Sequence, residues 1–394
     1  MTQAPGSHRL LLLLCALLLL ACTPTPQDGS ALQQPAGEPL KVVFVYIDPL
    51  GDRGWTWAHD QGRLAIEETF GEQVETSYVE HLPGAGDPTE AIRALAEQGY
   101  DVIFTTSFDF IEPTEQVAQE FPKSWFISIS GDETAPNLST VFGRMEMAPY
   151  LSGLVAGAAT QSNQIGYIAA FDIPEVVRGL NAFTLGVRAV NPEAEVQVRY
   201  IGSWFAPEQE VATAHTLLEA GVDVLTQHQA STVIQQAAQE AGVASIGYHS
   251  DMRRFVGDSV LTSAVWDWRA KYTEVIGQIL AGTYQSESYY GHEVVDLAPV
   301  SPQVSAATVA QVEGQETALR SGAADVFCGP LRSNTEVLVV EAGKCLTDAE
   351  LFTMQWYAEG VVGDAPAPAP GGLGQSSDKA PAWQLIEPTS RLAP

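Results

Sequence analysis

The sequence predicts an α/β protein with two doubly wound, parallel-sheet lobes. Its 394 residues are too many for one small domain and suit two lobes of ordinary size. From Lys41 onward, apolar runs alternate with helical stretches, which is typical of parallel sheets covered by helices. The alternation forms two series, one on each side of about residue 145, and each series predicts one lobe.

The apolar runs are the expected strands. Several are apolar without interruption, which indicates strands buried on both faces. The first series comprises residues 41–47, 74–80, 101–106 and 124–130, and the second comprises 165–170, 195–201, 223–227 and 243–248.

Two of the segments between the runs carry helix signals. Asp87 occupies an N-cap position, Pro88 follows in the first turn, and Glu90 completes a capping box. In a later helix, Pro207 opens the first turn and Gly221 ends the pattern. Helices between strands are the crossover connections that a parallel sheet requires.

The chain is expected to cross between the lobes several times. Residues 142–161 have a helical pattern rich in small residues, which predicts close packing where one lobe passes into the other. The pattern resumes at 261–284, where the chain is expected to return. The prediction assigns residues 40–144 and about 260–290 to the first lobe, and 145–259 and about 291–362 to the second. Such lobes enclose a cleft at the carboxyl ends of their strands.

The two ends of the chain differ from the lobes in composition. Residues 1–22 contain one Arg and then a leucine run too short for a comfortable membrane span, as in export signals. Leu-Leu-Ala-Cys at 19–22 resembles a bacterial lipobox, whose cleavage leaves Cys22 as the lipid-bearing N-terminus; ordinary cleavage beside a chance Cys is the alternative. We expect an exported protein anchored to a bacterial membrane by acyl chains such as palmitate. Residues 23–39 indicate a flexible tether, and 363–394 a disordered Ala/Pro-rich tail.

The charge and the cysteines limit the partners and the compartment. Lys+Arg 19 against Asp+Glu 48 gives a formal net charge of -29, which excludes nucleic acid as a partner. Cys15 leaves with the signal and Cys22 carries the lipid, so Cys328 and Cys345 remain. In an oxidising compartment these two form either a disulfide or two independent thiols.

Aromatic and acidic residues recur where the predicted strands end. Trp55 and Trp57 follow the first strand, and Trp57 falls off the apolar face of the next helix, so a cleft is expected there. Later strand ends are followed by Phe108, Asp109, Trp204, Asp251 and Trp266. Aromatic faces stack on planar heterocycles, and carboxylates accept hydrogen bonds from ring N–H groups. A neutral, planar ligand rich in donors therefore fits better than an anion. The alternative is that Trp55 or Trp57 only packs its loop against the sheet.

No motif indicates catalysis, a metal or a cofactor. His249, Ser250 and Asp251 are adjacent and cannot adopt the geometry of a catalytic triad, and there is no G-x-S-x-G elbow. The seven histidines are scattered, without H-E-x-x-H or Cys-x-x-Cys patterns. We expect a protein that is not an enzyme, with no cofactor.

The sequence resembles the basic membrane lipoprotein (BMP), or purine nucleoside receptor A-like, family of ABC-transporter substrate-binding lipoproteins. The resemblance runs from about Lys41 to Gly363, on segments that are specific together, among them GDRGWTWAHDQG, TTSFDFIEPTEQVAQEFP, GRMEMAPYLSGLVAGAAT, GSWFAP, IGYHSD and LFTMQWYAEGVVG. It implies a type I periplasmic-binding-protein fold with hinge crossovers. It also implies delivery of purines or related solutes to a permease with an ATPase. We expect the protein to be a monomer.

Departures from the family pattern narrow the expected ligand. Thr56 and Trp57 stand where nucleoside-binding relatives have an Asn-Asp pair, and Trp266 stands where they have a Lys that contacts ribose. Asp251 matches the family's ligand-binding acid, and Trp204 matches its stacking aromatic. Aromatic surface in place of ribose contacts favours a nucleobase over a nucleoside.

The expected binding residues share aromatic or acidic character. Trp204 is expected to stack on one ring face, with Trp55 or Trp57 on the other, while the acids accept ring hydrogens. The full set is Trp55, Trp57, Asp60, Phe108, Trp204, Asp251 and Trp266. Two other interpretations stay open: a membrane-tethered sensing receptor and a carbohydrate-binding protein of the same fold, since sugars also stack on Trp.

Overall fold

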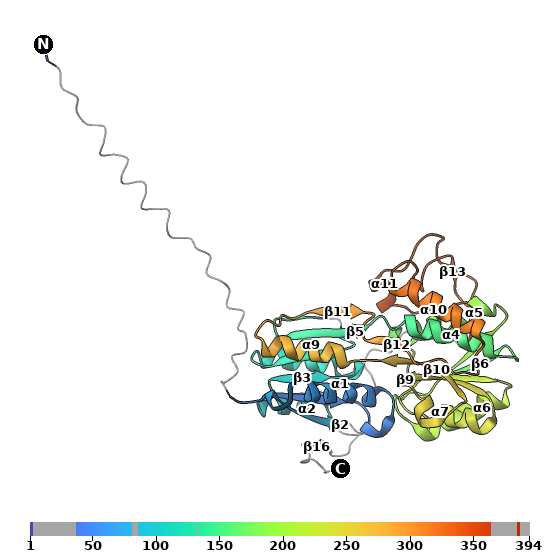
Figure 1. Ribbon diagram of the computed structural model, residues 1–394, viewed down its shortest axis with the longest axis horizontal. Helices are drawn as coiled ribbons and strands as arrows, with labels where there is room; N and C mark the ends of the chain where they lie inside the picture. Colours follow the sequence, from blue (N-terminus) through green and yellow to red (C-terminus); the bar gives the residue numbers. More distant parts are fainter. Residues whose placement is uncertain (3–36, 81–85, 132, 364–383, 387–394) are drawn as a thin grey trace.

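The computed structural model describes residues 1–2, 37–80, 86–131, 133–363 and 384–386. Most of the predicted signal, the predicted lipid site at Cys22, most of the tether and most of the tail lie outside these residues. The described chain forms two lobes, each built on a seven-stranded sheet, which lie side by side in Figure 1. Two parallel sheets with helices on their faces confirm the predicted α/β class.

The first lobe contains a sheet of order β11-β5-β4-β3-β1-β2-β16. Its pairings are parallel except that of β16 with β2. The strands are β1 (Leu40–Tyr46), β2 (Val74–Glu80), β3 (Val102–Thr105), β4 (Trp125–Ile129), β5 (Leu138–Gly143), β11 (Ser288–Gly291) and β16 (Gln384–Ile386). Strands β3 and β4 are buried along their whole length, because helices cover both faces of the sheet.

Two pairs of helices cover the first sheet. On one face lie α1 (Trp55–Phe70) and α9 (Arg269–Leu280); on the other lie α2 (Pro88–Glu97) and α3 (Ile111–Glu120). The Asp87 carboxylate caps α2 by accepting a hydrogen bond from the Thr89 N–H at 2.8 Å. Glu90 instead pairs with Arg93, at 2.6 Å, so the structure differs from the expected capping box. Short 3₁₀ turns are η1 (Leu50–Asp52), η2 (Gly71–Gln73) and η3 (Phe108–Phe110).

The second lobe contains a sheet of order β12-β10-β9-β8-β6-β7-β15, parallel except at β12. Its strands are β6 (Gln164–Ala169), β7 (Glu195–Tyr200), β8 (Val224–His228), β9 (Ala244–His249), β10 (Val260–Trp266), β12 (Val295–Leu297) and β15 (Val361–Val362). Its helices are α4 (Met147–Ala159), α5 (Pro174–Val190), α6 (Pro207–Glu219), α7 (Val233–Ala241), α8 (Arg253–Val256) and α10 (Ala306–Arg320).

Close packing of α4 on α5 confirms the expectation from the small residues of this segment. A Cβ at Gly153 would lie 2.2 Å from the Phe183 carbonyl oxygen, and one at Gly186 would lie 2.0 Å from that of Tyr150. The two helices therefore approach so closely that only glycine fits at these positions.

The lobe boundaries differ from the expectation at one crossover. Residues 260–266 form β10, which pairs with β9 in the second sheet, so the chain returns to the first lobe after Trp266 and not near residue 260. The apolar run at 260–266 has the character of a central strand and gives no sign of which sheet it joins. In the described residues between 37 and 363, crossings follow Gly143, Trp266 and Gly291.

The C-terminal segment adds a small unit to the second lobe. It contains β13 (Leu331–Arg332), β14 (Leu338–Val340) and α11 (Asp348–Phe352), and a disulfide joins Cys328 to Cys345. Of the tail that was expected to be disordered, residues 384–386 form β16 on the edge of the first sheet.

Candidate ligand-binding site

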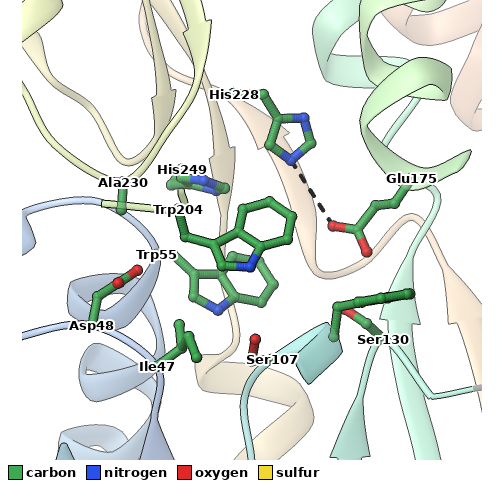
Figure 2. Close-up of a pocket in the computed structure, with 11 residues that line it drawn as sticks. Ile47, Asp48, Trp55, Ser107, Ser130, Glu175, Trp204, His228, Ala230 and His249 are labelled. Carbon is green, nitrogen blue, oxygen red and sulfur yellow. Dashed lines mark ion pairs between the residues drawn. The ribbon is translucent and has the colours of Figure 1, made fainter. Parts of the chain in front are cut away.

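A pocket of about 360 Å³ lies between the lobes, at the carboxyl ends of strands from both sheets (Figure 2). The first lobe contributes Ile47, Asp48, Trp55, Ser107, Phe108 and Ser130; the second contributes Glu175, Trp204, His228, Ala230 and His249. This is the edge at which open α/β sheets bind ligands. Ser130 and His249 have φ of 69° and 67°, left-handed values that are uncommon outside glycine and gather at ligand sites.

Two tryptophans supply flat surface from opposite lobes. Trp55 begins α1, and its indole N–H donates to the Thr106 carbonyl at 2.6 Å. Trp204 follows β7, and its indole N–H donates to the Asp109 carboxylate of the first lobe at 2.8 Å. Because both N–H groups are already engaged, these side chains offer a ligand aromatic surface. The bond from Trp204 to Asp109 also shows that the lobes touch across the pocket.

Two carboxyl groups face the pocket from opposite lobes. Asp48 lies two residues after the end of β1 and is 5% exposed, and its Oδ2 accepts no hydrogen bond from any described residue. Burial, followed by the neighbouring charges of Asp52, Asp109 and Glu210, raises the pKa of Asp48 well above its usual range. Burial also raises the pKa of Glu175 to about 7, although Arg178 and Ser130 oppose the shift. Both groups would gain from a ligand that donates hydrogen bonds.

The two histidines of the pocket are neutral near pH 7. Burial, with a smaller effect of Arg178, lowers the pKa of His228 to about 3. His228 Nε2 lies 3.9 Å from Glu175 Oε1, and its Nδ1 has no partner among the described residues. Burial likewise lowers the pKa of His249, whose Nδ1 accepts a hydrogen bond from the Trp266 indole at 3.1 Å. None of the described lining residues is Lys or Arg, so the pocket suits a neutral ligand and disfavours an anion.

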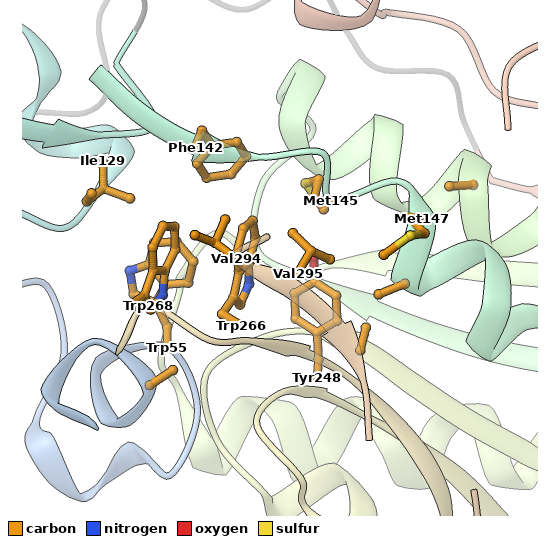
Figure 3. Packing of buried hydrophobic residues seen from close by; sticks show 14 of the residues in the cluster. Trp55, Ile129, Phe142, Met145, Met147, Tyr248, Trp266, Trp268, Val294 and Val295 are labelled. Atoms are coloured by element: carbon orange, nitrogen blue, oxygen red, sulfur yellow. The ribbon is translucent and has the colours of Figure 1, made fainter. Parts of the chain in front are cut away.

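A column of stacked rings supports Trp55 from behind (Figure 3). Trp266 stacks on Trp268 at 5.0 Å, and Trp268 stacks on His59 at 4.6 Å. The Trp55 ring meets Trp266 edge-on, at 5.4 Å and 85°. Edge-to-face and offset-stacked pairs of this kind are the favourable arrangements of aromatic rings. They fix the Trp55 ring and close this side of the pocket.

A second, larger cavity of about 1000 Å³ lies beside α1, and we call it the side groove. Its lining residues come from both lobes and include side chains of both charges. They are Trp57, Ala58, Gln61, Ser250, Asp251, Arg254, Val265, Trp266, Asp267, Arg269, Asp296, Leu297, Ala298 and Pro299.

The structure distributes the expected binding residues over three places. Trp55, Phe108 and Trp204 line the pocket. Trp57, Asp251 and Trp266 line the side groove instead. Their side chains face this cavity from the start of α1, from just after β9 and from the end of β10. Asp60 lines neither cavity: its Oδ1 accepts hydrogen bonds from Arg63 at 2.6 Å and from the Tyr46 hydroxyl at 3.1 Å. These two bonds fix its carboxylate beneath α1.

Several pocket residues escaped the sequence-based prediction. Asp48 directly follows the first strand, so the strand-end rule that identified Trp55 also applies to it. Glu175 sits in the first turn of α5, where an acid indicates favourable interaction with the helix dipole and no more. His228 ends β8 and directly follows the predicted strand 223–227, so the strand-end rule applies to it as well.

Two kinds of feature are not found in the part of the chain that the structure describes. It contains no cluster of three or more His, Cys, Asp or Glu side chains that could hold a metal. Among the described helices, none is both long and apolar enough to cross a bilayer.

Comparisons with known proteins agree with this geometry. The model of the family of PnrA-like ABC transporter substrate-binding proteins matches residues 40–320. A purine-binding protein of Brucella abortus is 36% identical over 328 residues, which cover 83% of this chain and 94% of that protein. A protein of Haloferax volcanii named for glucose binding in an ABC transporter is 36% identical over 335 residues, covering 84% and 82%.

Solved structures support the fold. An ABC transporter solute-binding protein from Aeropyrum pernix superimposes with a TM-score of 0.65 at 18% identity, covering 75% of this chain and 93% of that one. At this identity the likeness shows the periplasmic-binding-protein-like fold alone. The assignment to a family rests on the length of the family match and on the 36% identity to the two relatives. The chain therefore belongs to the family of PnrA-like ABC transporter substrate-binding proteins, which bind solutes and are not enzymes.

Proposed function

We propose that this protein captures a purine nucleobase in the interlobe pocket and delivers it to the permease of an ABC transporter. The observation that carries the proposal is an interlobe pocket with aromatic side chains from both lobes, the buried carboxyl group of Asp48 and the largely buried one of Glu175. A purine base is flat, neutral and edged with N–H groups, and these properties match such walls. The Brucella abortus relative, named for purine binding, supports the same ligand class.

Each pocket residue then has a role that its position supports. Trp204 stacks on one face of the base and Trp55 closes the other, while Phe108 completes the wall. Asp48 and Glu175 accept N–H groups from opposite edges of the ring. The stacks contribute about 1–3 kcal/mol each, which is insufficient for micromolar binding without these hydrogen bonds.

Preference for the base over its nucleoside follows from what surrounds the pocket. The column of stacked rings behind Trp55 fills the space on that side of the pocket. Trp266 belongs to this column, at the position where nucleoside-binding relatives are expected to have a Lys. A ribose attached to the base would meet aromatic carbon in place of hydrogen-bonding groups. Leaving its hydroxyls unpaired would cost about 1–3 kcal/mol for each buried group.

The setting of the protein is also part of the proposal. We propose that it is exported, tethered to a bacterial membrane through lipid on Cys22, and active as a monomer. The lobes close over the ligand, and the permease and its ATPase receive the closed form. Labelling with a radioactive palmitate precursor tests the anchor, because Cys22→Ser should abolish incorporation. Equal labelling of the variant would disprove this attachment site.

Isothermal titration calorimetry tests the ligand. We expect adenine, guanine or hypoxanthine to bind at micromolar or lower Kd and the matching nucleosides at least about tenfold more weakly. Glucose is the second candidate, because a relative of equal identity is named for it. Tight binding of nucleosides without binding of bases, or binding of glucose alone, would contradict the proposal.

A further inference from the structure

The residues at the start of α1 contact the second lobe outside the pocket. The rings of Trp57 and Phe255 meet edge-on, with centroids 5.6 Å apart and planes at 82°. The guanidinium carbon of Arg53 lies 5.3 Å from the centre of the same Phe255 ring. Phe255 belongs to α8 of the second lobe. Two side chains of the first lobe therefore hold one aromatic ring of the second.

Two backbone contacts join the same surfaces. The Ser250 hydroxyl, just after β9, donates a hydrogen bond to the Arg53 carbonyl. A Cβ at Gly54 would come within 1.9 Å of the Ala230 carbonyl oxygen, so the backbones of the two lobes touch there. Only glycine permits this approach.

Asp52 fixes the geometry of this segment. Its carboxylate accepts hydrogen bonds from the backbone N–H groups of Gly54, Thr56 and Trp57 at 2.9, 2.8 and 3.0 Å. These donors lie at the start of α1 and would otherwise lack partners within the helix. Because Asp52 is 2% exposed, these bonds are shielded from water. These hydrogen bonds lie within the first lobe and fix the start of α1. They therefore set the direction in which the Trp57 side chain leaves the helix.

We propose that Arg53, Trp57 and Phe255 form an interlobe latch that stabilises the closed arrangement of the lobes without touching the ligand. Trp57 is a positioning residue: it lines the side groove, whereas Trp55, two residues earlier, lines the pocket. Since both tryptophans leave the same helix end, contact with the ligand and contact between the lobes form in one movement. A ligand that needs closed lobes binds more tightly as the closed fraction rises.

The latch goes beyond the proposed function, because its contacts involve no ligand and can form whatever the ligand is. It also accounts for Trp57, whose position off the apolar face of α1 predicted a cleft residue. The half-buried ring does meet the other lobe, but it meets Phe255.

Single-molecule energy transfer on the ligand-free protein tests the latch. Glu68→Cys in α1 and Glu240→Cys in α7 place fluorophores at exposed positions, one on each lobe. We expect a measurable closed fraction, and a ratio of closed to open molecules about tenfold lower in Trp57→Ala and in Phe255→Ala. The double variant should lose little more than either single variant, because each one already breaks the pair.

Phe70→Ala is the matched control. Phe70 is a half-buried aromatic on the same helix, but it packs toward Gly277 of α9 within the first lobe. We expect it to leave the closed fraction unchanged. Trp57→Phe keeps an aromatic edge and should restore most of the closed fraction, which a general loss of structure would not allow.

Three results would overturn the latch: a ligand-free protein that is wholly open, a closed fraction that Trp57→Ala leaves unchanged, or full additivity in the double variant. Because this experiment contains no purine, an error in the proposed ligand would appear only in the titrations. Where a ligand does bind, its Kd should rise in Trp57→Ala by the same factor as the closed fraction falls.

Discussion

The pocket and the side groove lie on two sides of the first turn of α1, yet they differ in chemistry. The described lining of the pocket holds two carboxyl groups, two neutral histidines and no Lys or Arg. The side groove is larger, and acids such as Asp251 share it with Arg254 and Arg269. Residues two apart on a helix point in roughly opposite directions, so Trp55 and Trp57 serve different surfaces. Aromatic residues that follow a strand thus predict a position between the lobes. Which of the two cavities each residue lines depends on the direction in which its side chain leaves the helix.

Blocking the contact between the lobes should have the largest effect. Gly54→Ala places a Cβ against the Ala230 carbonyl, so we expect ligand binding to weaken more than about 100-fold as closure becomes unfavourable. Calorimetry and energy transfer measure this directly. Gly51→Ala is the matched control, because nothing lies within 4 Å of the added Cβ there. Equal, small effects of both variants would show that binding needs no such close approach.

Removing a wall of the pocket should come next. Trp204→Ala loses one stacking face and should weaken binding about 10- to 100-fold, measured by calorimetry. Trp204→Phe keeps the face but loses the hydrogen bond to Asp109, so it should lose clearly less. If the Ala and Phe variants bound equally well, stacking on Trp204 would not contribute to affinity.

The carboxyl group of Glu175 should give the pocket a pH dependence. Its pKa of about 7 in the ligand-free protein falls when a ligand N–H favours the carboxylate, so binding releases a proton below pH 7. Affinity should therefore rise with pH up to about 7, by at most about tenfold per unit, and then level off. Titrations from pH 5.5 to 8 measure this, and Glu175→Gln should remove this component, leaving the pH dependence that comes from the raised pKa of Asp48. Affinity that rises as pH falls would mean that protonated Glu175 donates to the ligand.

A change confined to the side groove should have the smallest effect. The sequence-based prediction placed Asp251 among the ligand contacts, and a direct contact would make Asp251→Asn cost about tenfold or more. Its position in the side groove predicts a change in Kd of less than about twofold by calorimetry. A tenfold loss would show that the ligand extends from the pocket into the side groove.

Particular residues show how far the sequence could predict this molecule. The strand-like runs correctly predicted strands β1–β4 and β6–β9, and burial on both faces accounts for the mainly apolar runs of β3 and β4. The run that forms β10 did not reveal which sheet the strand joins, because a central strand has the same apolar pattern in either lobe. For the site, Trp55, Phe108 and Trp204 could be predicted as pocket residues from the strand ends. The hydrogen bond from Tyr46 to Asp60 could not, because the two residues lie on different elements, β1 and α1, and only folding brings the Tyr46 hydroxyl to that carboxylate.

The ligand retained by the purified protein tests the central claim most directly. The protein is denatured after purification, and the released small molecules are identified and quantified by mass spectrometry, with Trp204→Ala prepared in parallel. The account predicts a purine base in up to equimolar amount from the native chain and strongly reduced amounts from the variant. A nucleoside or a sugar recovered in equimolar amount, and lost from the variant, would contradict it.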